Sequence, residues 1–381
     1  MALPLSGIRV LDLSRHLPGP YVTAALVDLG ASVVKIEERE SGDPVRFMSP
    51  AVPDGSDSAL HAWLNRGKKS VALDLKSAQG RAIVRALAAK SDLLVESFRP
   101  GVMRRLGLDF PRLRRAAPRL LYVSLSGFGA TGPLARRAMH DLNAVGQAGL
   151  LGSAVASPGL AADTASGLLT LIAILAKLRG QRRPGFRGGF IDLSILDGAL
   201  ALMSVPLVRS LSAPMVEHDE LWGTHACYRA YECADGRRIT IGALEPQFWT
   251  AICRATGFPG HAKNQWSRKR QPEICADFER LLKTKSQSDW MAMLGPLDAC
   301  VMPVQTVAEV LTDPQIRARQ AFAPQKSARG SFTSPTFLPQ VTGGRVRRRA
   351  PRHGEHTRPV LLALGYSKMR IQTLLDTGVI R

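Results

Sequence analysis

The 381-residue sequence is poor in cysteine, and the cysteines that it has do not stand in the CxxC spacing typical of metal sites. The five cysteines are Cys227, Cys233, Cys253, Cys275 and Cys300. An odd, scattered set of this kind is typical of a reduced compartment. We therefore expect a cytoplasmic protein, and the sequence predicts no metal site.

Long apolar runs are also missing. No uninterrupted run of about 18 apolar residues occurs, which predicts that no helix spans a membrane. The first residues, MALPLSGIRVLDLS, lack the basic-then-apolar order of a signal peptide and are expected to lead into a first strand. Hydrophobic residues still make up 45% of the chain, enough for a sizeable core, and the length predicts about two domains.

Acidic residues are scarce: 31 Asp and Glu stand against 51 Lys and Arg, which gives a net charge of +20. Such an excess makes nucleic-acid binding a rival hypothesis. The arginines are spread along the chain, however, and the one dense run, RVRRRAPRH at 345–353, has no zinc-finger or RNA-binding motif beside it. A small ligand with several phosphates explains a basic pocket equally well, and a solvated basic surface remains the simplest alternative. A nucleic-acid partner is not expected.

Strand-like and helix-like segments alternate through the first half of the chain. The expected strands are 8–14, 32–37, 70–75, 92–97 and 120–128. Expected helices include 21–30, which Gly30 closes, and a helix capped by Ser77. This rhythm predicts an α/β fold, with a large domain built on a doubly wound, mostly parallel, Rossmann-like sheet. The first turn, SRHLPGPY, has no GxGxxG, which disfavours a nicotinamide-dependent enzyme.

The rhythm changes after residue 200. The stretch 228–244 is typical of a hairpin turning at Asp235-Gly236, and helical segments follow it, which predicts a smaller α+β domain. Expected boundaries are a large domain at 1–200 completed by 330–381, a linker at 201–225, the small domain at 226–312 and a return linker at 313–329. The Ser-, Pro-, Gly- and Arg-rich stretch 326–352 is expected to be a connection.

Three residues are candidates for chemistry. His140 precedes Asp141, Asp163 stands where an apolar helix at 161–180 is expected to begin, and Glu245 follows a strand. Each has an ordinary structural interpretation: a hydrogen-bonded loop histidine, a helix N-cap and a first-turn charge. No one of these signals is specific by itself.

The motifs LSGIRVLDLS, VDLGASVVKIE, LNRGKKSVALDLKS, VESFRPGV, SGFGATGP, IDLSILDG and DPQIRARQ together resemble the family III CoA-transferase group over nearly the whole chain. Within that group, AMHDLN, YECADGR and GALEPQF resemble the α-methylacyl-CoA racemases. Transferases of the group share the aspartate that matches Asp163, where it is the nucleophile, and usually lack counterparts of His140 and Glu245. The segment between His140 and Asp163 is shorter here than in the racemases.

The resemblance implies catalytic roles for His140, Asp163 and Glu245, and an interlocked homodimer in which Glu245 could come from either chain. CoA is implied to bind the first domain as part of an acyl-CoA substrate, without a separate cofactor. The residues proposed to bind CoA are Arg39, Leu73, Lys76, Ser97, Phe98, Arg99, Arg105, Asp141 and Asn143. Guanidinium groups suit phosphate because their donors form a fork.

The residue types suit inversion of a carbon next to a thioester. One group removes the α-proton and another returns a proton to the opposite face. Asp163 would have to be protonated part of the time, which requires a water-poor site. Amides at the start of its helix are expected to stabilise the enolate oxygen, and Glu245 to orient His140, with Asp141 as support. Three functions stay open: a racemase or epimerase, a CoA transferase with Asp163 as nucleophile, and a non-catalytic protein that binds nucleic acid or CoA. The acyl chain is not identified.

Overall fold

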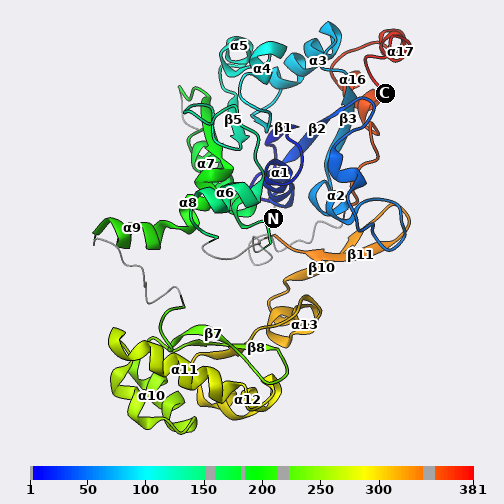
Figure 1. The fold of residues 1–381 in the computed structure, drawn as a ribbon. Coiled ribbons are helices and arrows are strands. Elements are labelled where there is room, and N and C mark those ends of the chain that lie inside the picture. Colours follow the sequence, from blue (N-terminus) through cyan, green and yellow to red (C-terminus); the bar gives the residue numbers. More distant parts are fainter. Residues whose placement is uncertain (1–2, 152–158, 182–184, 213–222, 338–347) are drawn as a thin grey trace. The chain divides into compact units, whose positions relative to one another are not determined.

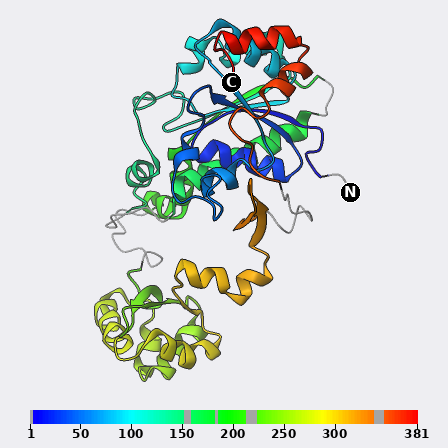
Figure 2. The ribbon, with the colours of Figure 1, turned by 90° about the vertical axis from the view of Figure 1, so that its right-hand side faces the viewer.

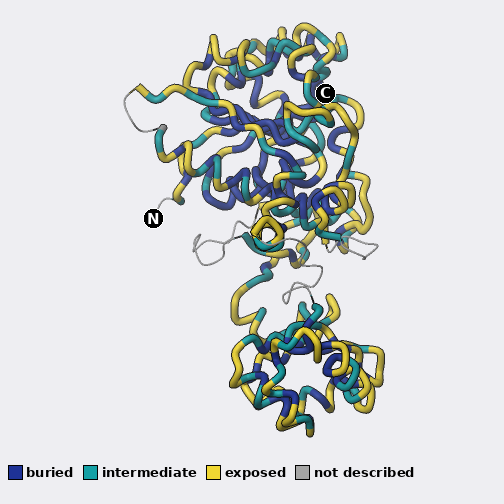
Figure 3. The backbone as a smooth tube through the Cα atoms, turned by 60° about the vertical axis from the view of Figure 1, so that its left-hand side comes forward, coloured by how far each residue is buried: buried dark blue, intermediate teal, exposed yellow. Residues whose placement is uncertain are grey.

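The computed structural model describes residues 3–151, 159–181, 185–212, 223–337 and 348–381 (Figure 1). The chain forms two compact units. Met1–Ser204 and Ala318–Arg381 make the large unit, and Val205–Arg317 makes the small unit. The divisions fall inside the two expected linkers, 201–225 and 313–329. Each unit has buried segments at its own centre, as the dark-blue tube in Figure 3 shows.

The large unit is built on a six-stranded sheet in the order β3-β2-β1-β4-β5-β6. Its strands are β1 (Arg9–Leu13), β2 (Ser32–Glu38), β3 (Lys69–Leu73), β4 (Leu93–Glu96), β5 (Leu121–Ser126) and β6 (Gly189–Ser194). Every pair in this sheet is parallel. The expected strands and the doubly wound sheet are confirmed, and β6 is a strand that the sequence pattern did not predict.

Helices of the large unit follow the strands. They are α1 (Pro18–Asp28), η1 (Pro44–Phe47), α2 (Ala59–Leu64), α3 (Ala78–Ala89), α4 (Val102–Leu106), α5 (Phe110–Ala116), α6 (Asp141–Gln147), α7 (Ala161–Gln181), α8 (Ile195–Leu202), α16 (Thr357–Ala363) and α17 (Lys368–Asp376). The predicted cap of α3 is present, because Ser77 Oγ accepts the Gly80 N–H at 2.9 Å. Gly30, just beyond α1, has a φ of +104°, a conformation that glycine adopts without strain.

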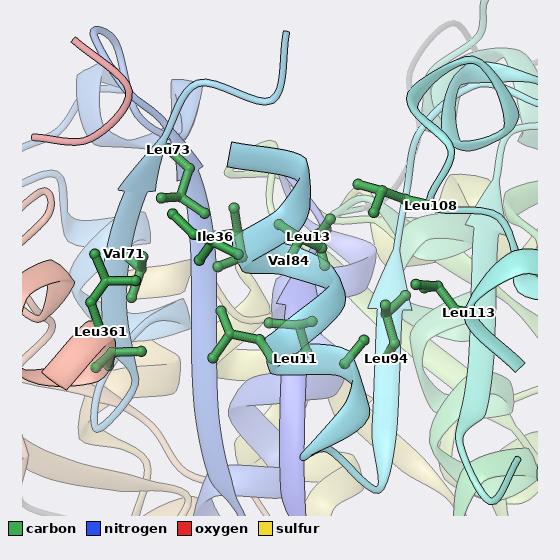
Figure 4. Packing of buried hydrophobic residues seen from close by; sticks show 14 of the residues in the cluster. Leu11, Leu13, Ile36, Val71, Leu73, Val84, Leu94, Leu108, Leu113 and Leu361 are labelled. Atoms are coloured by element: carbon green, nitrogen blue, oxygen red, sulfur yellow. The ribbon is translucent and has the colours of Figure 1, made fainter. Parts of the chain in front are cut away.

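Alternating side chains of the strands form two cores, one on each face of the sheet. Leu11 and Leu13 of β1 point into the core shown in Figure 4, together with Val84 of α3 and Leu361 of α16. Val10, which precedes Leu11, points to the opposite core, which α1 and α7 cover. Figure 2 shows the red C-terminal helices on one side of the sheet and the dark-blue α1 on the other. This two-sided covering explains why the strands are almost continuously apolar.

Segments from the end of the chain complete the large unit. Ile380 forms an isolated bridge with Leu73 of β3, and the Asp74 N–H donates to the Val379 carbonyl at 2.9 Å. Strands β10 (Phe322–Lys326) and β11 (Ser331–Pro335) pair as an antiparallel hairpin. The sequence predicted only a connection at 326–352, so the β11 part of this hairpin corrects that prediction. Residues 338–347 lie outside the described residues.

The small unit is α+β, as expected. Its three-stranded antiparallel sheet has the order β7-β8-β9 and consists of β7 (Tyr228–Glu232), β8 (Arg238–Gly242) and β9 (Val301–Pro303). Its helices are α10 (Pro246–Ala255), η3 (Pro259–Asn264), η4 (Arg268–Arg270), α11 (Gln271–Leu282), α12 (Gln287–Leu294), η5 (Gly295–Leu297), α13 (Val307–Thr312) and α14 (Pro314–Ala318), and α9 (Ser204–Ser212) begins at the division between the units. Trp249, Phe278 and Trp290 are buried in its core. The predicted turn is present, with Gly236 at a φ of +74°.

Helix α7 is the apolar helix that the sequence analysis expected at 161–180, and it ends one residue later, at Gln181. By length and composition alone, Ala161–Gly180 could cross a membrane, with a mean hydropathy of 1.5, and the bent pair α8–α9 passes the same test as one span. Leu171, Ile174 and Leu178 of α7 are buried in the core beneath the sheet. Burial of these residues accounts for part of the apolar character of α7, since 39% of the apolar window within Ala161–Gly180 is buried.

Candidate active site

A cavity of about 300 Å³ opens at the carboxyl ends of four strands of the large unit. The loops that follow β1, β4, β5 and β6 all contribute to its wall. Because the chain order reverses between β1 and β4, the cavity lies at the switch point where ligands bind in doubly wound sheets. Its lining residues are Arg15, His16, Pro18, Ser97, Phe98, Arg99, Pro100, Leu125, Ser126, Gly127, Ala135, Arg137, Ala138, Met139, His140, Asp163 and Ile195.

Asp163 is the buried acid of this cavity. Its residue is only 9% exposed, and its Oδ1 atom is buried without a hydrogen-bond partner. Burial, with a smaller contribution from the charge of Asp141, raises the pKa of Asp163 from 3.8 to about 7. The carboxyl group can therefore be protonated or ionised near neutral pH, as two-base chemistry requires.

Asp141 supports Asp163 through the backbone. The Asp163 N–H donates to Asp141 Oδ1 at 2.9 Å, and the Thr164 N–H donates to the Leu160 carbonyl at 3.0 Å. Helix α7 begins at Ala161, so Asp163 lies inside its first turn and the predicted N-cap role is wrong. The amide of Asp163 is already occupied by Asp141. It is therefore not a free donor for an enolate oxygen, contrary to the expectation for this part of the helix.

His140 stands at the N-cap position of α6. Asn143 fixes its backbone, because the His140 N–H donates to Asn143 Oδ1 at 3.0 Å. Met139, the residue before His140, packs closely against Gly127. A Cβ on Gly127 would lie 2.4 Å from Cγ of Met139, so only glycine at position 127 leaves room for the Met139 side chain as it is placed. The structure brings His140 and Asp163 to one cavity, as the sequence predicted from the resemblance, and uses Asp141 and Asn143 to hold both backbones.

The loop after β4 carries three of the residues proposed to bind CoA. Ser97, Phe98 and Arg99 all line the cavity. Buried Glu96 holds this loop by accepting the Phe98 N–H at 2.7 Å, and burial raises the pKa of Glu96 to about 7. Ser97 Oγ in turn accepts the Arg15 N–H at 2.9 Å. A polar loop fixed in this way can receive a polar or charged ligand without first being ordered.

The other residues proposed to bind CoA lie outside this cavity. Lys76 and Arg105 are exposed, and Arg39 forms an ion pair with Glu40. Leu73 is 0% exposed and packs in the core of Figure 4. Its side chain is therefore not available to a ligand, which corrects the prediction for that residue. The alternation of β3 directs Leu73 inward, whereas the motif match took no account of the direction of the side chain.

Glu245 lies in the small unit, at the N-cap position of α10. Its side chain is exposed, and it makes no capping hydrogen bond. The backbone carbonyl of Glu245 accepts the Phe248 N–H at 3.1 Å and so fixes the start of the helix. The carboxylate is not needed to cap the helix. The predicted contact of Glu245 with His140 stays a prediction.

The sequence analysis missed Arg15, His16 and Arg137. All three line the cavity, and within the described residues none of the three side chains forms an ion pair with a carboxylate. A signal for Arg15 and His16 was present, because SRHLPGP directly follows the first strand and the carboxyl ends of parallel strands form ligand sites. Among the described residues, no group of three His, Cys, Asp or Glu side chains is arranged to hold a metal.

Residues 5–357 match the family model of CoA-transferase family III, and the chain belongs to that family. It is 32% identical to alpha-methylacyl-CoA racemase of Homo sapiens over 99% of this chain and 98% of the relative. It is also 30% identical to succinyl-CoA:glutarate CoA-transferase of Homo sapiens, over 99% and 90%. Among solved structures, a CaiB/BaiF family protein from Brucella suis superposes with a TM-score of 0.81 at 28% identity, over 96% of this chain and all of that chain.

Proposed function

We propose that the protein is a racemase or epimerase that inverts the α-carbon of 2-methylacyl-CoA thioesters. The observation that supports this function is the pairing of two proton carriers in one cavity: the imidazole of His140 and the carboxyl of Asp163. With its pKa raised to about 7, Asp163 exists in both forms at neutral pH. A reversible inversion needs both forms, since each enantiomer requires the opposite starting state.

The reaction proceeds through an enolate. In one direction neutral His140 removes the α-proton, the electron pair passes to the thioester oxygen, and protonated Asp163 delivers a proton to the other face. In the reverse direction ionised Asp163 removes the proton, and the imidazolium of His140 delivers one. Proton transfer of this kind typically contributes 10²–10⁴-fold per group. Glu245 is proposed to accept a hydrogen bond from the distal ring nitrogen of His140 and so fix its tautomer.

CoA serves as the handle of the substrate. The fixed loop Ser97–Arg99 and the guanidinium of Arg15, which lies over the Phe98 ring at 5.2 Å from its centroid, offer donors for its polar parts. A branched acyl group is supported by the similarity to a protein named alpha-methylacyl-CoA racemase. This similarity extends over 99% of this chain and 98% of that relative.

A CoA transferase is the second candidate function. Asp163 would attack the thioester carbon and expel CoA thiolate, which gives a mixed anhydride. The thiolate would then attack the Asp163 carbonyl of the anhydride and release the donor acid as a free carboxylate, leaving an aspartyl-CoA thioester. A second carboxylate would attack this thioester and expel the thiolate again, and attack of the thiolate on the acyl carbonyl of the new anhydride would form the product thioester and regenerate Asp163. The similarity to succinyl-CoA:glutarate CoA-transferase favours this alternative. So does the unpartnered Oδ1 of Asp163, since a nucleophile needs a free oxygen. Nucleophilic catalysis leaves His140 without a task, which is why we prefer the racemase.

The isotope at the α-carbon distinguishes the two reactions. Given one enantiomer of a 2-methylacyl-CoA in deuterated water, the enzyme is expected to form the other enantiomer with deuterium at the α-carbon. The proton that returns comes from a group that exchanges with solvent, whereas a transferase leaves the α-hydrogen untouched. Chiral chromatography with mass spectrometry measures both products.

The same incubation is repeated with an added free carboxylic acid and, separately, with hydroxylamine. If CoA moves to the acid, and hydroxylamine traps an aspartyl intermediate while no branched substrate gains α-deuterium, the enzyme is a transferase. Because both functions use Asp163, the isotope result and not a mutation of Asp163 decides between them.

A homodimer is also proposed. Large apolar side chains are exposed on α7 and α8 of the large unit and on α9, and exposed apolar surface of this extent is typical of protein interfaces. These residues are Leu168, Ile172, Leu200, Leu202, Val205, Leu207, Val208 and Leu211. Light scattering is expected to give twice the chain mass of 41.2 kDa. A fully active species with the mass of one chain would rule out the dimer.

A further inference from the structure

His16 is a second imidazole at the cavity that carries His140. The two ring centroids are 6.3 Å apart, and the planes are nearly perpendicular, at 86°. Both rings and Asp163 line the same cavity. Among the described residues, the His16 ring has no hydrogen-bond partner, so its nitrogens are available to a ligand.

The backbone holds His16 in an uncommon conformation. Its φ of +63° lies in the left-handed region, which is strained for a residue with a side chain. The His16 N–H donates to Asp43 Oδ1 at 3.3 Å, and Asp43 is itself held by a buried ion pair with Lys35 at 2.8 Å. A clamp built from buried charges therefore fixes His16. Strain maintained in this way is concentrated at functional sites.

The proposed reaction needs a hydrogen-bond donor for the thioester oxygen. The sequence analysis expected this donor among the amides at the start of the helix that carries Asp163. Negative charge develops on the thioester oxygen when the α-proton leaves, and a preorganised hydrogen-bond donor must meet it. The amide of Asp163 is taken by Asp141. The thioester oxygen is only two bonds from the α-carbon, so its donor must lie close to His140. Of the side chains at the cavity, His16 places its ring beside the ring of His140, with the two centroids 6.3 Å apart.

We infer that His16 is a further catalytic residue, which donates a ring N–H to the thioester oxygen as that oxygen gains negative charge. The inference rests on the proposed function for the enolate, but the same oxygen also gains charge in the tetrahedral intermediate of a transferase. The donor is therefore expected in either reaction. No proton is transferred to the oxygen, and the hydrogen bond strengthens as the charge develops.

The surroundings of His16 favour a neutral ring. Burial lowers the pKa of the His16 imidazole, and positive charge on His140, Arg15 and Lys35 acts in the same direction, while Asp43 opposes it. A neutral imidazole donates one N–H without quenching the negative charge that the reaction must create and then remove. Neutral histidines serve as electrophiles in this way in other enzymes.

The test uses two variants that tolerate a left-handed backbone. His16→Gly removes the imidazole without adding strain, and His16→Asn keeps an N–H donor on a shorter side chain. In the full-length enzyme, kcat of His16→Gly is expected to fall by about 10²–10³-fold, as for loss of one oxyanion donor, while KM for the acyl-CoA changes little. His16→Asn is expected to retain clearly more activity than His16→Gly, and added imidazole to restore part of the activity of the glycine variant.

The wild-type enzyme is first assayed for α-deuterium uptake and for CoA transfer, and kcat of whichever reaction occurs is then followed. If the proposed racemase function is wrong, the wild-type enzyme shows no α-deuterium uptake. If the role of His16 is wrong, only the kcat values of the His16 variants show it. A kcat of His16→Gly within about twofold of wild type, or a loss confined to KM, overturns the role of His16. If His16→Gly does not fold, His16→Asp replaces it, because an ionised aspartate has no hydrogen-bond donor and is nearly isosteric with asparagine. Equal kcat values for His16→Asp and His16→Asn would then overturn the inference.

Discussion

Replacement of Asp163 by asparagine is expected to lower turnover by about 10⁴-fold or more while stabilising the protein at alkaline pH. The amide cannot exchange a proton near neutral pH and is not a nucleophile, so the loss is expected whether the enzyme is a racemase or a transferase. The shape of the side chain is retained, and the hydrogen bond from the backbone of residue 163 to Asp141 does not involve the changed atoms.

The gain in stability follows from the raised pKa of Asp163, about 7 in the folded state against an ordinary value of 3.8. The folded protein binds this proton more tightly than the unfolded chain does. The contribution of the protonated carboxyl to stability is therefore complete below about pH 4 and is lost as the pH rises to about 7. Above that pH the wild type buries a charge that asparagine never carries. The loss amounts to roughly 2–4 kcal/mol in the free energy of unfolding.

Denaturant unfolding of wild type and Asp163→Asn at about pH 4.5 and about pH 8 measures the effect, together with turnover at neutral pH. The surface variant Asp376→Asn, which also removes one carboxylate, is the control, because Asp376 is exposed on α17. The stability difference between the Asp163 variant and wild type should be larger at the higher pH, and the control should show no such change. An equal difference at both pH values would mean that Asp163 is ionised throughout.

Replacement of His140 by alanine is expected to slow α-proton exchange by 10²–10⁴-fold, the usual effect of losing one general base. Binding of the CoA thioester should be nearly unchanged, since the polar loop at Ser97–Arg99 lies on a different strand end. The hydrogen bond from the His140 N–H to the Asn143 side chain should also survive, because alanine keeps this N–H. Exchange of label between solvent and the α-carbon gives the rate, and titration with the thioester gives the affinity.

Arg136→Ala is the matched control, since Arg136 belongs to the same segment and is exposed but does not line the cavity. Wild-type exchange in His140→Ala would show that this histidine is structural. If exchange were lost but CoA transfer to an added acid persisted, Asp163 would act without His140, and the transferase would be the better description.

The sheet could be predicted from the sequence because its strands are short apolar runs separated by helical segments, and burial on both faces requires such runs. The hairpin β10–β11 was not recognised as one element because its second half and the following residues are rich in Ser, Pro and Gly, a composition shared by loops. Leu73 was misassigned for a different reason: a motif match carries no information on the direction of a side chain, which the alternation along β3 decides.

The candidate site was predicted in part. His140 and Asp163 line one cavity, and a hydrogen bond from the Asp163 N–H to Asp141, 22 residues earlier in the chain, helps to hold them there. No local periodicity of the sequence predicts such a contact. The raised pKa of Asp163 depends on burial by distant elements, which composition does not reveal. His16 escaped notice because its φ of +63° is set by Asp43, 27 residues further along the chain. A residue whose conformation is fixed by tertiary contacts has no signature in its own sequence neighbourhood.

The order in which the ribosome delivers the chain has a consequence for this architecture. The large unit begins at the N-terminus, yet Leu361, Ile371 and Leu374 of its core, and the bridge from Ile380 to Leu73, are synthesised after the whole small unit. The small unit is continuous in sequence, so it can fold during synthesis. One face of the sheet of the large unit stays incompletely covered until Leu361, Ile371, Leu374 and Ile380 have been synthesised. The nascent large unit therefore exposes apolar surface while the small unit is being synthesised.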